Sequence, residues 1–180
     1  MKTTVSMLAL VAAFGVSIPA FADVTHGKGS TIGMPGKKTE ASRTVTIVMK
    51  DNSFSIENIP VKAGETIRFV VRNEGELLHE FNIGTPDMHA THQQQMMKMV
   101  ELGALTPTSL NLNMSSHVAM GHSSADMAGM KHDDPNSVLV EPGKSAELVW
   151  KFSTPGTIEF ACNVPGHYQT GMMGKFNFAN

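Results

Sequence analysis

The run FACNVPGHYQTGMMG near the carboxyl end of the chain holds three side chains that can bind metal ions: Cys162, His167 and Met172, five residues apart. Apolar residues alternate up to Cys162, so a strand should end there with the sulfur on its buried side. Pro165-Gly166 is a turn signal that would bring His167 back toward the sulfur. Met172 lies at the far end of the same loop. The spacing predicts a metal site where one strand passes through a loop into the next.

A fourth ligand must come from elsewhere, and His79 in ELLHEFNIG is the natural candidate, at the start of another predicted strand. Two imidazoles, a thiolate and a weak thioether form the ligand set of a mononuclear copper electron-transfer site. Zinc is the competing metal, because a Cys-His-His set can bind it tetrahedrally, but thioether is a poor zinc ligand. Met173, beside Met172, is a second source of axial sulfur. We therefore expect one copper ion at His79, Cys162, His167 and Met172.

The elements that must position these ligands have the pattern of strands. Apolar residues recur at every second position within residues 44–50, 66–72, 146–152, 157–162 and 175–178. Turn signals such as Asn73-Glu74-Gly75 and Pro155-Gly156 separate the segments. Short strands with one buried face and frequent turns predict an all-β protein, an antiparallel β-sandwich or a small barrel.

One long connection interrupts this pattern. Residues 86–132 hold 8 of the 14 Met and 5 of the 8 His, and connections of this length are usually functional. The first part predicts a short helix with Thr91 as N-cap, an end at Gly103, and a packing face of Met96, Met99 and Val100. The second part has no period. We expect the His and Met side chains of residues 114–132 to make transient, weak extra copper contacts, the alternative being an irregular surface loop.

The amino-terminal residues predict export. Residues 1–22 have a charged start, a short apolar stretch and the cleavage pattern Ala20-Phe21-Ala22, which is typical of a signal peptide. A membrane anchor is the alternative, but the apolar run is shorter than the ~20 residues that span a bilayer. We expect a periplasmic protein with a flexible arm over residues 23–42, a domain over residues 43–180 and no membrane span in the mature chain.

Composition excludes several classes of protein. The chain has 180 residues, a formal net charge of −2 and a single Cys, so it has no internal disulfide framework and no basic surface for nucleic acid. It contains no HExxH, GxSxG or Gly-rich phosphate motif, and no paired His-x-His motif for further copper clusters. We therefore do not expect an enzyme.

The order of these ligands resembles the cupredoxins of the plastocyanin/azurin superfamily. A strand, a Cys, a His and a Met at these intervals are similar to the carboxyl-terminal copper loop of that family, with His79 matching the upstream ligand. The segments HEFNIGTP and FACNVPGHYQTGM around a Met/His-rich insertion are similar to CopI-type periplasmic cupredoxins linked to copper tolerance. The resemblance implies a Greek-key β-sandwich with type 1 copper held strongly by His79, Cys162 and His167 and axially by Met172.

Three functions fit such a site. We expect a periplasmic copper-binding protein that serves copper tolerance and cycles between Cu(I) and Cu(II). The first alternative is an electron carrier for a respiratory or photosynthetic chain, and the second is a copper chaperone or store that does no redox chemistry. The expected partners are copper ions and a redox or copper-transfer protein. The loose Met/His tract favours copper handling, because a pure electron carrier gains nothing from competing copper ligands.

Overall fold

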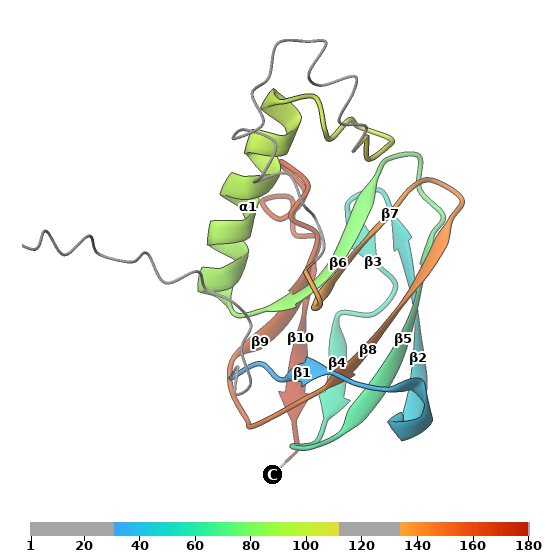
Figure 1. Cartoon of the computed structure of the whole chain (residues 1–180), viewed down its shortest axis with the longest axis vertical. Coiled ribbons are helices and arrows are strands. Elements are labelled where there is room, and N and C mark those ends of the chain that lie inside the picture. Colours follow the sequence, from blue (N-terminus) through green and yellow to red (C-terminus); the bar gives the residue numbers. More distant parts are fainter. Residues whose placement is uncertain (1–30, 112–133, 180) are drawn as a thin grey trace, which may run out of the picture.

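The computed structural model describes residues 31–111 and 134–179. Two five-stranded sheets face each other as a sandwich, with one helix beside them (Figure 1). The all-β sandwich predicted from the alternating segments is confirmed. The expected signal peptide and the Met/His tract of residues 114–132 lie outside the described residues.

The first sheet has the order β1-β8-β5-β2-β3. Its strands are β1 (Met34–Pro35), β2 (Arg43–Lys50), β3 (Ser53–Phe54), β5 (Thr66–Asn73) and β8 (Ser145–Lys151). The second sheet has the order β4-β10-β9-β6-β7. Its strands are β4 (Asn58–Val61), β6 (His79–Gly84), β7 (Ser137–Val140), β9 (Ile158–Ala161) and β10 (Met173–Phe178).

Two strand pairs are parallel, β2 with β5 and β4 with β10, whereas the sequence predicted an antiparallel arrangement. The cause is the path of the chain, which leaves the first sheet after β3, forms β4 in the second, and returns to the first as β5. The remaining strand pairs of the described residues are antiparallel. Where the chain crosses from one sheet to the other, consecutive strands do not pair with each other, and strands that are distant in sequence become neighbours.

Aromatic side chains fill the space between the sheets. The rings of Phe54, Phe69, Phe81 and Phe160 meet in tilted and edge-to-face contacts with centroids 5.2–6.1 Å apart. Such geometries suit the quadrupoles of the rings and contribute about 0.5–1.5 kcal/mol per pair beyond burial. Cys162 and Met172 belong to the same buried cluster. These two candidate ligands are therefore part of the close-packed core.

The expected boundary of the flexible arm differs from the structure. Residues 34–35 form β1 against β8, and Ile32 is fully buried. The Trp150 indole donates a hydrogen bond to the Ile32 carbonyl at 2.9 Å. The short 3-10 helix η1 (Lys38–Glu40) follows before β2. Residues 31–42 thus pack on the domain, because a single apolar side chain and an indole donor fix a segment that shows no hydrophobic period.

The helix α1 (Pro86–Glu101) begins earlier than predicted. Its N-cap is Thr85, whose hydroxyl accepts the Met88 N–H, and Pro86 occupies the first turn, where proline is favoured. Thr91, the predicted N-cap, lies inside the helix. The end near Gly103 agrees with the prediction, since Gly103 has φ 72° just after the C-cap Leu102. No helix within the described ranges is long and apolar enough to cross a membrane.

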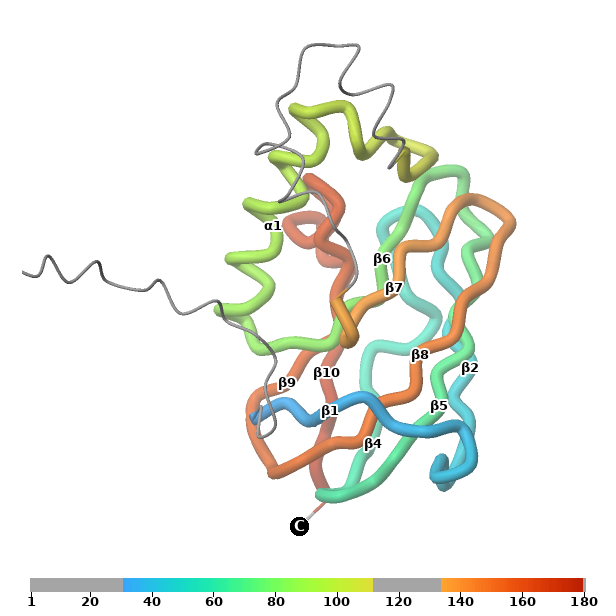
Figure 2. The backbone as a smooth tube through the Cα atoms, viewed as in Figure 1, coloured from blue at the N-terminus to red at the C-terminus, as the bar shows by residue number. Residues whose placement is uncertain are grey.

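The buried face of α1 also differs in part from the prediction. Met96 and Met99 are buried as expected, but Val100 is 42% exposed, because it lies at the margin of the buried stripe. The other members of that stripe are His89 and His92. Figure 2 shows α1 lying beside the loop that joins β9 to β10, and the Gln169 amide there donates to Gln93 of the helix at 2.7 Å. The helix is therefore part of the surroundings of the candidate ligands.

Candidate metal centre

The structure brings three of the predicted ligands together. His79 begins β6, Cys162 directly follows β9, and His167 lies in the next turn. The Cys162 sulfur is 3.3 Å from Nδ1 of His167 and 3.9 Å from Nδ1 of His79. All three ligand atoms lie within 4.8 Å of one another, and all three residues are buried. No other such group of metal-binding side chains occurs among the described residues.

The segment from Cys162 to Met172, here called the ligand loop, is folded by its own backbone hydrogen bonds. His167 N–H donates to the Val164 carbonyl at 3.0 Å, closing a turn in which Gly166 has φ 90°. This left-handed conformation at the third turn position is the one glycine adopts without strain. The Pro165-Gly166 signal therefore does what the sequence predicted and returns His167 toward the sulfur.

Met172 closes the ligand loop. Its carbonyl accepts the Cys162 N–H at 3.1 Å, and its own N–H donates to the His167 carbonyl at 3.0 Å. The Met172 side chain is fully buried, whereas Met173 is half-buried and begins β10 opposite Ala161. The backbone thus ties Met172 to two of the candidate ligands.

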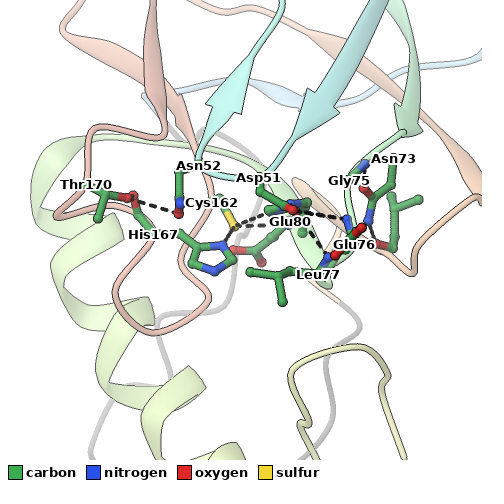
Figure 3. Close-up of polar contacts among 12 residues, drawn as sticks. Asp51, Asn52, Asn73, Gly75, Glu76, Leu77, Glu80, Cys162, His167 and Thr170 are labelled. Atoms are coloured by element: carbon green, nitrogen blue, oxygen red, sulfur yellow. Dashed lines mark hydrogen bonds and ion pairs between the residues drawn. The ribbon is translucent and has the colours of Figure 1, made fainter.

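Asp51 fixes the orientation of the His79 ring. Its Oδ1 lies 3.0 Å from Nε2 of His79, and it also accepts the N–H groups of Glu76 and Leu77 (Figure 3). The hydrogen bond from His79 is the main cause that lowers the pKa of Asp51. The carboxylate is therefore ionised and accepts a hydrogen bond from the Nε2–H group of His79. The lone pair of His79 is therefore left on Nδ1, which faces the sulfur. A carboxylate behind a metal-binding His is a recurrent feature of metal sites.

The turn before His79 has little spare room. The Asn73 side chain accepts the Gly75 N–H at 2.9 Å and donates to the Leu77 carbonyl at 2.7 Å. A Cβ at Gly75 would stand 2.4 Å from Asp51 Oδ1 and 3.1 Å from His79 Nε2. Only glycine allows the close approach of this backbone to the Asp51–His79 pair.

Burial governs protonation at the site. It raises the pKa of the Cys162 thiol to about 12, although the Glu80 N–H, 3.3 Å from the sulfur, acts in the opposite direction. Burial is also the main cause that lowers the pKa values of His79 and His167. At neutral pH both imidazoles are neutral and can donate a lone pair, while the thiol keeps its proton until a cation displaces it.

The donor set and its spacing fit a copper ion. With metal–sulfur bonds of about 2.3 Å and metal–nitrogen bonds of about 2.0 Å, the sulfur and a nitrogen bound to the same three- or four-coordinate ion lie roughly 3.5–3.7 Å apart. The observed 3.3 and 3.9 Å fall on either side of this range. A thiolate with two imidazoles and a neighbouring methionine is the set that selects copper.

Sequence patterns alone missed the groups that surround the ligands. Asp51 lies in the turn between β2 and β3, far from the ligands in sequence, and no motif marks it. Glu80 alternates with its neighbours as an outward-facing strand residue would, yet it is fully buried. His89 and His92 could have been found, since they precede Met96 and Met99 at helical spacing on one face.

Comparison with known proteins agrees with this geometry. The family model described as a cupredoxin-like domain matches residues 6–174. The copper-resistant cuproprotein CopI of Pseudomonas aeruginosa is 51% identical over 164 residues, which cover 89% of this chain and 90% of that protein. The copper-resistant cuproprotein CopI of Rubrivivax gelatinosus is 34% identical, with 94% and 93% covered.

Solved structures share the fold. Reduced auracyanin from the photosynthetic bacterium Roseiflexus castenholzii superposes with a TM-score of 0.54 at 23% identity, covering 78% of this chain and 99% of that one. Auracyanin B superposes with a TM-score of 0.55 at 17% identity, covering 84% and 100%. At these identities the likeness concerns the β-sandwich alone.

Proposed function

Because the chain belongs to the cupredoxin-like family and, within it, to the CopI copper-resistant cuproproteins, we propose that it binds one copper ion and protects the cell against copper excess. The observation that carries the proposal is the convergence of the Cys162 sulfur and the Nδ1 atoms of His79 and His167 within 4.8 Å. Met172 is the proposed axial ligand. The leader-like pattern of residues 1–22 supports a periplasmic location.

Different residues have different roles in the proposed copper binding. Asp51 holds His79 with Nδ1 toward the site, and the turn at Gly166 does the same for His167. The Cys162 thiol gives up its proton on binding, and the Glu80 N–H stabilises the resulting negative charge on sulfur. When bound, copper supplies a one-electron couple between Cu(I) and Cu(II). The burial of Cys162, His79 and His167 limits the access of water and of oxidants to the sulfur. The proposed role is therefore copper binding and protection.

Copper tolerance of living cells tests this function. Deletion of the gene should lower the copper concentration that stops growth, and the wild-type gene should restore it. Cys162→Ser should not restore it, although the protein accumulates to the same level by immunoblot. Met97→Leu, a change at an exposed methionine of α1, is the matched control and should restore tolerance in full. Equal tolerance of the deletion strain and the wild type would reject the proposal.

A further inference from the structure

A buried acidic side chain adjoins the proposed copper site. Glu80 directly follows His79 and is fully buried. Its backbone N–H points to the Cys162 sulfur, whereas its carboxylate belongs to a network of polar side chains. A buried carboxylate is costly unless charge and hydrogen bonds compensate it. The hydrogen-bond partners of the Glu80 carboxylate therefore indicate its structural role.

One oxygen of the carboxylate holds the ligand loop. Glu80 Oε2 accepts the Asn163 backbone N–H at 3.1 Å and the Asn163 side-chain amide at 2.8 Å. Asn163 follows Cys162 in the chain and is itself fully buried. The residue after one proposed ligand is thus bonded to the residue after another. This link fixes β6 and the start of the ligand loop relative to each other.

The other oxygen binds the helix. Glu80 Oε1 lies 2.8 Å from Nε2 of His92, in α1, and accepts the Ser137 hydroxyl at 2.5 Å. His92 Nδ1 lies 3.0 Å from Gln95 Oε1 and 3.7 Å from the half-buried Asp134 carboxylate, so an acceptor stands at each ring nitrogen. Burial lowers the pKa of His92, but the Glu80 carboxylate outweighs it, with the pKa raised to about 9. The 2.8 Å contact between two buried groups and the raised pKa of His92 both favour a positively charged imidazole beside this side chain.

We infer that Glu80 and His92 are positioning residues for the copper centre: the Glu80 carboxylate locks the two ligand-bearing segments together, and the His92 cation on α1 cancels its charge. This inference rests on the copper binding proposed above. Since Cu(II) carries one more positive charge than Cu(I), an uncompensated carboxylate next to the ligands would stabilise Cu(II). Helix α1 thereby helps to set the balance between the two oxidation states without supplying a ligand.

The test compares copper-loaded variants of the full chain by reduction potential and by the thiolate-to-copper absorption band. His92→Gln removes the cation and should lower the potential and shift the band. Glu80→Gln with His92→Gln removes both charges and should bring the potential back toward the wild-type value. Lys98→Gln, which removes a positive charge from the exposed face of the same helix, is the control and should change neither measurement.

Each outcome decides between the proposals. A wild-type protein without the absorption band would refute the copper site itself. A normal band in wild type with an unchanged potential in His92→Gln would overturn the inference and leave the copper site standing. If His92→Gln does not fold, recovery of folding and of the band in the double variant supports the ion pair, because the double variant removes both members of the pair together. Failure of the double variant as well would overturn it.

Discussion

Asp51 Oδ1 lies 3.0 Å from Nε2 of His79, on the side of the ring opposite to the nitrogen that faces Cys162. The same carboxylate accepts two backbone N–H groups of the turn that leads into His79. One side chain therefore fixes both the backbone before a proposed ligand and the tautomer of its ring. The β2–β3 turn thus contributes to a site whose proposed ligands all come from the other sheet or its loops.

Asp51→Asn should weaken copper binding by roughly 10- to 100-fold, the usual cost of losing a partner behind a metal ligand. The amide can still accept a hydrogen bond, but it no longer favours the Nε2–H tautomer by charge. Competition with a chromogenic Cu(I) chelator measures the affinity. Asp87→Asn, an exposed change of the same kind in α1, should leave the affinity unchanged. Equal losses in both variants would argue against a specific role of Asp51.

Met172→Leu should raise the reduction potential, because leucine donates no electron pair and Cu(II) depends on the additional donor more than Cu(I) does. Met173→Leu, at the half-buried neighbour, should leave the potential unchanged. Protein-film voltammetry of both copper-loaded variants gives the comparison. A shift confined to Met173→Leu would move the axial role to that residue.

The stability of the metal-free protein should fall as the pH rises from about 7 to about 10. The pKa of His92 is raised from 6.5 to about 9 in the folded protein, so its stabilising effect is complete below pH 6.5 and is lost as the pH passes 9. At about 1.4 kcal/mol per pKa unit, the full loss is roughly 3–4 kcal/mol. Urea unfolding at several pH values measures it.

The reference for this pH effect is His92→Gln. Its stability should be lower at pH 6.5 and should lack this part of the pH dependence. Identical pH profiles for wild type and variant would mean that His92 is not held as a cation in the folded protein.

Much of the fold follows from local pattern. Ile67, Phe69 and Val71 stand at every second position of β5 and are fully buried, as expected for a strand with one apolar face. The order of pairing did not follow, because the parallel partners β2 and β5 are set by a chain crossing that no local pattern records. The period of apolar residues shows which face of a strand is buried, but it does not show which strand lies beside it.

The candidate metal site likewise has contacts that the local sequence predicts and contacts that it does not. The spacing of Cys162 and His167 around Pro165-Gly166 predicted their approach, because a tight turn joins residues that are near in sequence. His79 was the candidate because it begins another predicted strand, and the family resemblance matched it to the upstream ligand; its Nδ1 lies 3.9 Å from the Cys162 sulfur. Asp51 and His92 were missed, since an isolated acid in a turn and a histidine in a helix acquire their roles only through contacts between distant segments.

Titration of the metal-free protein with Cu(II), followed by visible absorption, tests the central claim most directly. The account predicts an intense thiolate-to-copper band that reaches its maximum at one equivalent of copper and is absent from Cys162→Ser. Absence of the band from the wild-type protein, or its persistence in Cys162→Ser, would contradict the claim that His79, Cys162 and His167 together hold the ion.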